Sequence, residues 1–121
     1  MGAAVNKQEA FWGGEFGDEY HKRNAGRVAE NIAFFANALN CIETPLKSIF
    51  EFGAGTGDNL EALHRLIPDA ALWGVEINES AQRQIDFGSV MIGSILTFEM
   101  PEGCKPDLVF TKGVLIHIAP D

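Results

Sequence analysis

The stretch that decides the fold is Glu51-Phe52-Gly53-Ala54-Gly55-Thr56-Gly57-Asp58. It follows the short apolar run 48–52, which has the length of a buried strand, and it precedes a helical pattern. Glycine adopts positive φ without strain and lets a ligand approach the backbone closely. The alternative, a plain tight turn, needs one or two glycines, whereas three alternate here. The stretch therefore predicts a ligand-binding loop between a strand and a helix.

The spacing and the flanking charges of this loop limit what it can bind. Its G-x-G-x-G pattern departs from the G-x-G-x-x-G spacing that fits a dinucleotide pyrophosphate, and no Gly-Lys-Ser/Thr of a phosphate loop follows. Glu51 and Asp58 would repel a diphosphate, while Glu51 suits a cationic amino group. S-adenosylmethionine has that amino group and no phosphate, so it is the expected cofactor. An NAD site is the disfavoured alternative.

Glu76 is the expected ribose ligand. It lies 23 positions after Gly53, close to the offset of roughly 20 residues at which an acidic residue takes ribose hydroxyls. A carboxylate can accept hydrogen bonds from the 2′ and 3′ hydroxyls together. The alternative is a surface glutamate at a strand end.

Strand and helix patterns alternate along the chain. Short apolar runs predict strands over 48–52, 71–77, 89–93 and 107–111. Helical patterns cover 24–40, 58–67 and about 78–87. We expect Asp58 to cap the second helix and Asn78 or Ser80 to cap the third. This order predicts an α/β fold with a parallel sheet, right-handed crossovers and flanking helices.

Composition excludes several classes of function. Nine basic and seventeen acidic residues give a net charge of −8, which argues against nucleic-acid binding. No apolar run approaches the roughly 20 residues that span a bilayer, and the start lacks the order of a secretory signal. We therefore expect a cytoplasmic protein without membrane contact. The two cysteines, Cys41 and Cys104, are too few and too far apart for a zinc site, so no metal is expected.

Three motifs together resemble those of a known family. They are Glu-x-Gly-x-Gly-x-Gly from Glu51, Gly74-Val75-Glu76-Ile77-Asn78 and Asp107-Leu108-Val109-Phe110-Thr111-Lys112-Gly113. They resemble the cofactor motifs of Rossmann-like, class I S-adenosylmethionine-dependent methyltransferases, over residues 48–118. More narrowly, Phe11-Trp12, the run 16–20, Arg23-Asn24 and the run 111–118 are similar to methylases associated with pseudaminic acid biosynthesis.

The resemblance implies a set of cofactor-binding residues. The loop glycines would border the methionine part, and residues 111–113 would pass beside the reacting methyl group. The adenine would lie near Ile77, Ser94 and Ile95, where Ser94 stands in place of the acidic residue that relatives often use. The expected set is Trp12, Tyr20, Glu51, Gly53, Ala54, Gly55, Thr56, Gly57, Asn59, Glu76, Ile77, Ser94, Ile95, Thr111, Lys112 and Gly113.

Several of these positions have a structural alternative. Ile77 and Ile95 could equally be core residues, and Lys112 could be a solvated surface lysine. Trp12 and Tyr20 resemble parts of a cofactor lid but could instead cap the core. His117 is the candidate general base, and a hydrogen-bonded structural histidine is the alternative.

The resemblance also divides the chain. Residues 1–23, which follow no sustained period, are expected to form an aromatic loop or lid with one short turn, and 24–121 a Rossmann-like cofactor-binding domain. The family's sheet has the order 3-2-1-4-5-7-6, so four strands correspond to its N-terminal half. The apolar run 108–110 would then be uncovered, which predicts a homodimer at that edge or a swapped segment.

The expected activity is transfer of a methyl group from S-adenosylmethionine to a small-molecule acceptor, a sugar or sugar acid, with S-adenosylhomocysteine as the product. The alternative is a non-catalytic module that only binds S-adenosylmethionine or S-adenosylhomocysteine. Turnover with acceptors distinguishes the two.

Overall fold

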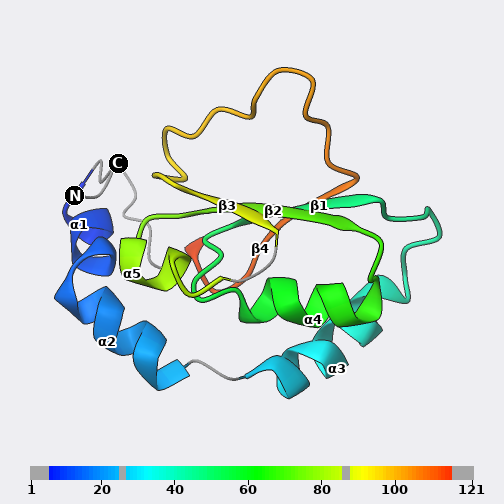
Figure 1. Ribbon diagram of the computed structural model, residues 1–121, viewed down its shortest axis with the longest axis horizontal. Coiled ribbons are helices and arrows are strands. Elements are labelled where there is room, and N and C mark those ends of the chain that lie inside the picture. The colour runs from blue at the N-terminus through cyan, green and yellow to red at the C-terminus, as the bar shows by residue number, and fades with distance from the viewer. Residues whose placement is uncertain (1–5, 25–26, 86–87, 116–121) are drawn as a thin grey trace.

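A four-stranded parallel sheet forms the centre of the molecule (Figure 1), whose computed structural model describes residues 6–24, 27–85 and 88–115. Its strands are β1 (Ser48–Phe52), β2 (Ala71–Glu76), β3 (Ser89–Ile92) and β4 (Leu108–Thr111), in the order β3-β2-β1-β4. The central strand β1 pairs with β2 on one side and β4 on the other, so Phe50 lies opposite both Trp73 and Val109. The predicted strands and their parallel order are confirmed.

The two faces of the sheet are covered differently. Helices α3 (Val28–Leu39) and α4 (Asp58–Leu66) lie on one face, and the loop that joins β3 to β4 runs over the other (Figure 1). The main core forms under the helices, from residues such as Phe35, Ile49, Leu60, Leu63 and Leu72. No helix among the described residues has the length and apolar character needed to cross a membrane.

The N-terminal segment differs from the sequence expectation. A loop with one short turn was expected, but the chain forms α1 (Lys7–Gly13) and α2 (Glu15–Asn24). Both helices are too short to display a sustained period. Asn6 caps α1, since its side chain accepts a hydrogen bond of 2.9 Å from the Glu9 backbone N–H. The aromatic rings then pack on one another, with Phe11 and Phe16 stacked at 4.1 Å between centroids.

Helix boundaries also differ at three places. α3 begins at Val28, whereas the helix was expected to begin at Asn24, which belongs to α2. Gly57, with φ of 87°, occupies the N-cap position of α4, so the expectation that Asp58 caps this helix was wrong. Helix α5 (Glu79–Gln82) is capped by Asn78, which was expected as the cap together with the alternative Ser80. The helix was expected to run to about residue 87, but it ends at Gln82. Residues 86–87 lie outside the described part of the chain.

Asn78 also joins the N-terminal helices to the sheet. Its side-chain amide donates hydrogen bonds to the Trp12 backbone oxygen at 3.1 Å and to Asp18 Oδ1 at 2.7 Å. Gly17 makes this approach possible, because a Cβ at residue 17 would lie 1.6 Å from the Trp12 oxygen. As a result α1 and α2 lie beyond the carboxyl ends of the strands (Figure 1).

Gly17→Ala should loosen this docking, because the added methyl group must displace the Trp12 carbonyl. Alanine ordinarily stabilises a helix relative to glycine, so a loss would report the contact and not helix propensity. We expect docking of residues 7–19 to weaken by about 1–3 kcal/mol, measured as faster amide hydrogen exchange. In the control Gly13→Ala the Cβ lies 3.4 Å from the Ile77 oxygen, so exchange should stay as in the wild type. Wild-type exchange in Gly17→Ala would contradict the docking.

Candidate cofactor site

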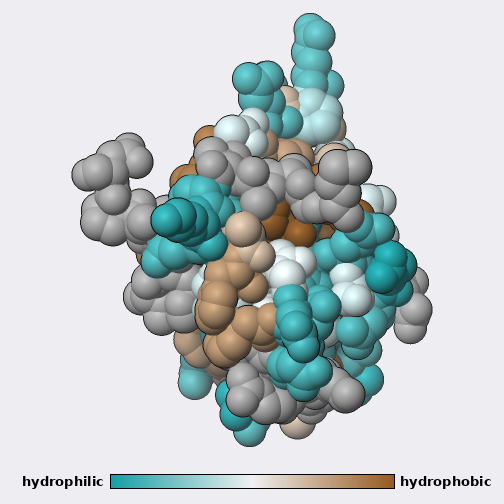
Figure 2. All heavy atoms as spheres, turned by 90° about the vertical axis from the view of Figure 1, so that its left-hand side faces the viewer, coloured by the Kyte–Doolittle hydropathy of each residue, from teal (hydrophilic) through white to brown (hydrophobic). Residues whose placement is uncertain are grey.

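A cavity of about 270 Å³ lies at the carboxyl ends of the strands. Segments that follow β1, β2, β3 and β4 line it, together with α1 and the start of α3. In the sheet, β2 lies on one side of β1 and β4 lies on its other side. The strand order therefore reverses at the carboxyl end of β1, and open α/β sheets bind ligands at such a switch point. Figure 2 views the side on which α1, α2 and α5 lie, with apolar residues gathered toward the middle and hydrophilic residues around them.

The glycine loop after β1 forms one wall of the cavity. Gly53, Gly55 and Gly57 have φ of 78°, 60° and 87°, a region that favours glycine. The N–H of Gly53 donates to the Val75 oxygen at 2.8 Å, and that of Gly55 donates to Glu76 Oε1 at 2.7 Å. These bonds hold the loop against the end of β2, and Gly53 and Gly55 line the cavity.

The Glu76 carboxylate lies at the centre of the site. It is 4% exposed, lines the cavity, and accepts from Gly55 N–H on one oxygen and from Asn78 N–H, at 2.7 Å, on the other. Its orientation is fixed by the backbone, which prepares it to accept from neighbouring hydroxyl groups.

Glu51 lies behind the cavity wall and is fully buried. Its Oε2 accepts a hydrogen bond of 2.6 Å from the Asn59 side chain, while its Oε1 finds no partner among the described residues. Burial raises the pKa of this carboxyl from 4.5 to about 8, with Glu76 and Asp58 adding to the rise and Asn59 and Lys112 opposing it. The site therefore holds a carboxyl group that is largely protonated at neutral pH and whose ionised form a nearby cation would stabilise.

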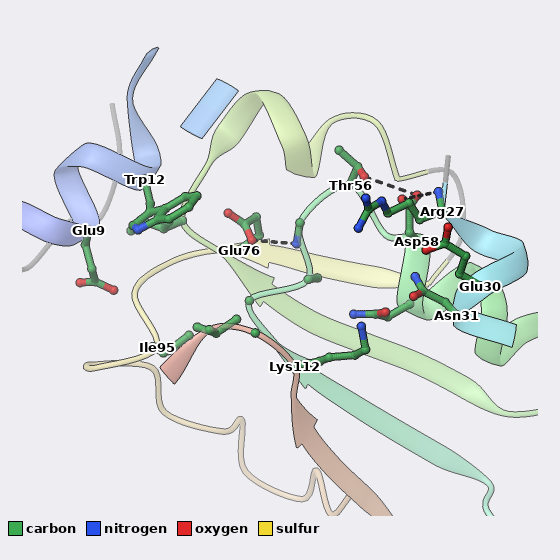
Figure 3. Close-up of a pocket in the computed structure, with 17 residues that line it drawn as sticks. Glu9, Trp12, Arg27, Glu30, Asn31, Thr56, Asp58, Glu76, Ile95 and Lys112 are labelled. Atoms are coloured by element: carbon green, nitrogen blue, oxygen red, sulfur yellow. Dashed lines mark hydrogen bonds between the residues drawn. The ribbon is translucent and has the colours of Figure 1, made fainter. Parts of the chain in front are cut away.

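The two ends of the cavity differ in character (Figure 3). Trp12 and Ile95 lie at one end, and Glu76 lies between that end and the other. The far end gathers charged and amide side chains from α3, α4 and the segment after β4, namely Arg27, Glu30, Asn31, Asp58, Asn59 and Lys112. The cavity thus runs from an aromatic and aliphatic end, past a buried carboxylate, to an end that carries both signs of charge.

Most of the residues expected from sequence meet at this cavity. Those that line it are Trp12, Gly53, Ala54, Gly55, Thr56, Asn59, Glu76, Ile77, Ile95, Lys112 and Gly113. The sequence did not single out Glu9, Arg27, Glu30, Asn31 or Val114, which line it too. No local motif marks Glu9, Arg27, Glu30 and Asn31, since tertiary packing brings α1 and α3 to the site, whereas Val114 lies within the run 111–118 of the resemblance.

Four expected residues lie outside the lining. Glu51 is behind the wall, and Gly57 is the N-cap of α4. Thr111 ends β4 with its hydroxyl buried and without a partner among the described residues. Ser94 is 1% exposed, and its hydroxyl hydrogen-bonds Glu9, so it meets the cavity only through that carboxylate. The side chain of Tyr20 and the whole of His117 fall outside what the structure describes.

Asp58 contributes differently from the cap expected of it. Its Oδ2 accepts from the Arg27 backbone N–H at 3.2 Å, which connects α4 to the start of α3 at the charged end of the cavity. Lys112 lies on the opposite side of this end, with its ammonium 5.1 Å from the centroid of the Phe34 ring. Within the described ranges, no three His, Cys, Asp or Glu side chains are grouped so as to hold a metal ion.

The fold is Rossmann-like, and it is similar to part of the fold of several solved methyltransferases. Similar solved structures include the plantazolicin methyltransferase BpumL in complex with SAH, with a TM-score of 0.62 and 18% identity over 86% of this chain and 44% of that chain. The sugar N-methyltransferase KedS8 from Streptoalloteichus sp. gives 0.61 and 20% over 82% and 40%. SAM-bound CalS10, an amino pentose methyltransferase from Micromonospora echinaspora, gives 0.58 and 21% over 80% and 41%.

These similarities are structural, and at such identities they establish the fold alone. No family model matches the chain, and no curated protein matches it in sequence. The chain spans less than half the length of each of these three methyltransferases.

The buried carboxyl of Glu51 predicts how the stability of the ligand-free protein depends on pH. Its pKa rises from 4.5 to about 8 on folding, so between these values the folded state binds more protons than the unfolded state. The free energy of unfolding should therefore fall as pH rises through this window. Glu51→Gln keeps the shape and removes the titration, so its melting temperature should fall less between pH 5.5 and 8.5, measured by circular dichroism.

The matched control is Glu61→Gln, which changes a carboxylate on α4 that pairs with Arg65 at 3.4 Å. Its pH dependence should follow that of the wild type. Parallel melting curves of Glu51→Gln and the wild type across the same pH range would show that Glu51 does not titrate there.

Proposed function

We propose that the cavity binds S-adenosylmethionine and that the chain takes part in methyl transfer from it to a small molecule. The observation that carries the proposal is the buried Glu76 carboxylate, fixed by Gly55 N–H, between an aromatic end and a charged end of one cavity. S-adenosylmethionine has the same order of groups: an aromatic base, a ribose diol and a zwitterionic amino acid.

The donors and acceptors present fit each part of this cofactor. Glu76 would accept from the ribose hydroxyls, and the loop glycines admit the ligand close to the backbone. Glu51 lies behind the loop wall, and an ammonium group near the loop would stabilise the ionised form of its buried carboxyl. Arg27 and Lys112 line the charged end of the cavity. Their cationic side chains would pair there with the carboxylate of the cofactor's amino acid part.

When bound, S-adenosylmethionine supplies a methyl group that the sulfonium already activates for displacement. The chain's own contribution would be positioning and exclusion of water. Glu76 and the glycine loop would fix the ligand, and Trp12 on α1, which lines one end of the cavity, would close that end as part of the lid segment. The general-base role expected of His117 stays a prediction.

The proposed acceptor is a sugar or sugar acid. Two of the similar structures are described as an amino pentose methyltransferase and a sugar N-methyltransferase, which supports this class. The net charge of −8 also favours a small molecule over a nucleic acid. The alternative is a non-catalytic cofactor-binding module. Release of S-adenosylhomocysteine in the presence of amino sugars separates the two.

Isothermal titration should show stoichiometric binding of S-adenosylhomocysteine and no binding of NAD. Gly55→Val should weaken that affinity about 10- to 100-fold, because a β-branched residue is strained at φ of 60°. The control is Gly103→Val, which imposes similar strain at φ of 83° in a loop with nothing within 4 Å of the new Cβ. It should bind like the wild type. A folded wild-type chain that binds no S-adenosylhomocysteine would overturn the proposal.

We also propose a homodimer through the β4 edge. Among the described residues β4 pairs only with β1, and Val109 on it is 48% exposed. Sedimentation equilibrium should give the mass of two chains, and Val109→Lys should shift the population toward the monomer. A wild-type monomer at high micromolar concentration would contradict the dimer.

A further inference from the structure

The lining of the cavity carries more negative than positive charge (Figure 3). It includes two cationic side chains, those of Arg27 and Lys112, and four carboxyl side chains, those of Glu9, Glu30, Asp58 and Glu76. A cleft lined mainly by one sign of charge attracts ligands of the opposite sign, because its low-dielectric walls focus the field. The lining therefore favours a ligand with a net positive charge.

A further carboxyl group, that of Glu51, lies behind this lining. Its neighbours in the sheet are Gly74 on β2 and Phe110 on β4, neither of which is charged. Because side chains alternate along a strand, Glu51 lies on the same face as Ile49, whose side chain belongs to the core under the helices. The carboxyl is fully buried as a result.

Asn59 on α4 connects this carboxyl to the cavity. Its side-chain amide donates to Glu51 Oε2 at 2.6 Å, and the residue lines the cavity. Glu51 Oε1 has no hydrogen-bond partner among the described residues. An ionised carboxylate accepts several hydrogen bonds, so a single donor compensates its burial poorly. This geometry favours the protonated carboxyl in the ligand-free protein.

The charged groups that surround Glu51 act in both directions. Burial is the main cause of its raised pKa of about 8, and Glu76 at the end of β2 and Asp58 on α4 add to the rise. Lys112 after β4 opposes it. From the start of α3, one guanidinium and one carboxylate reach the same end of the cavity, both on exposed residues. A positive charge that enters the cavity would act in the same direction as Lys112 and favour the ionised carboxyl.

We infer that binding of S-adenosylmethionine to the cavity releases a proton from the buried Glu51 to solvent, so that the affinity for this ligand increases with pH. The inference rests on the proposed function, because it takes the cavity to be the S-adenosylmethionine site. The ligand has a sulfonium, an ammonium and one carboxylate, and therefore a net positive charge. The coupling is electrostatic and acts through the cavity wall, so it requires no contact between Glu51 and the ligand.

The test is isothermal titration with sinefungin, an analogue in which an amine-bearing carbon replaces the methylated sulfur and which keeps the net positive charge. Titration at pH 7 in buffers of different ionisation enthalpy counts the protons released on binding. The wild type should release about 0.5–1 proton and bind about tenfold more tightly at pH 8 than at pH 6.5. Affinity rises only up to the pKa of the ligand-free carboxyl and levels off above it.

Glu51→Gln keeps the shape of the side chain and cannot titrate, so it should release almost no protons and bind with nearly the same affinity at both pH values. The matched control is Glu61→Gln on α4, which removes a carboxylate that pairs with Arg65 at 3.4 Å. It should release protons as the wild type does.

The outcomes separate the inference from the proposed function. A folded wild type that binds no sinefungin at either pH overturns the function. Wild-type affinity that is independent of pH, or equal proton release by Glu51→Gln and the wild type, overturns the inference and leaves the function standing. If Glu51→Gln fails to fold, the infrared difference spectrum of the wild type at pH 7 decides. The carbonyl band of a protonated carboxyl should disappear on saturation with sinefungin, and a band that persists refutes the inference.

Discussion

The hydrogen bond from Gly55 N–H to Glu76 Oε1 is the interaction on which the rest of the site depends. It joins the loop after β1 to the end of β2, and it forms only while the loop keeps the positive φ that glycine allows. The second oxygen of Glu76 accepts from Asn78 N–H, and the Asn78 side chain in turn binds Trp12 and Asp18. One chain of hydrogen bonds thus runs from the loop through the sheet to the N-terminal helices.

Three carboxyl groups are buried in this part of the molecule, and their environments differ. Glu76 is held by two backbone donors, Glu9 by the Ser94 hydroxyl, and Glu51 by Asn59 on one oxygen only. Burial raises the pKa of Glu51, and a ligand that carries positive charge near the loop would favour the ionised form of this carboxyl. This physical constraint favours S-adenosylmethionine over dinucleotides, whose phosphates would add negative charge to the same loop.

Local patterns in the sequence were enough to predict the sheet and many of the residues that line the cavity. Apolar runs of strand length and the glycine loop are local signals, and the offset from Gly53 to Glu76 follows from one strand–helix–strand unit. The N-terminal helices were not predicted, because each is too short to show a sustained helical period. Glu9 was not predicted either, because its contact with Ser94 joins residues 85 positions apart. Docking of short helices brings such residues together, and no spacing along the chain records it.

The most direct measurement is a crystal structure of the chain with S-adenosylhomocysteine bound. The account predicts the ribose hydroxyls on Glu76, the base between Trp12 and Ile95, and the amino acid end beside the loop glycines and Lys112. Density for the ligand elsewhere, or in the cavity with the base at the charged end, would contradict the assignment of the site.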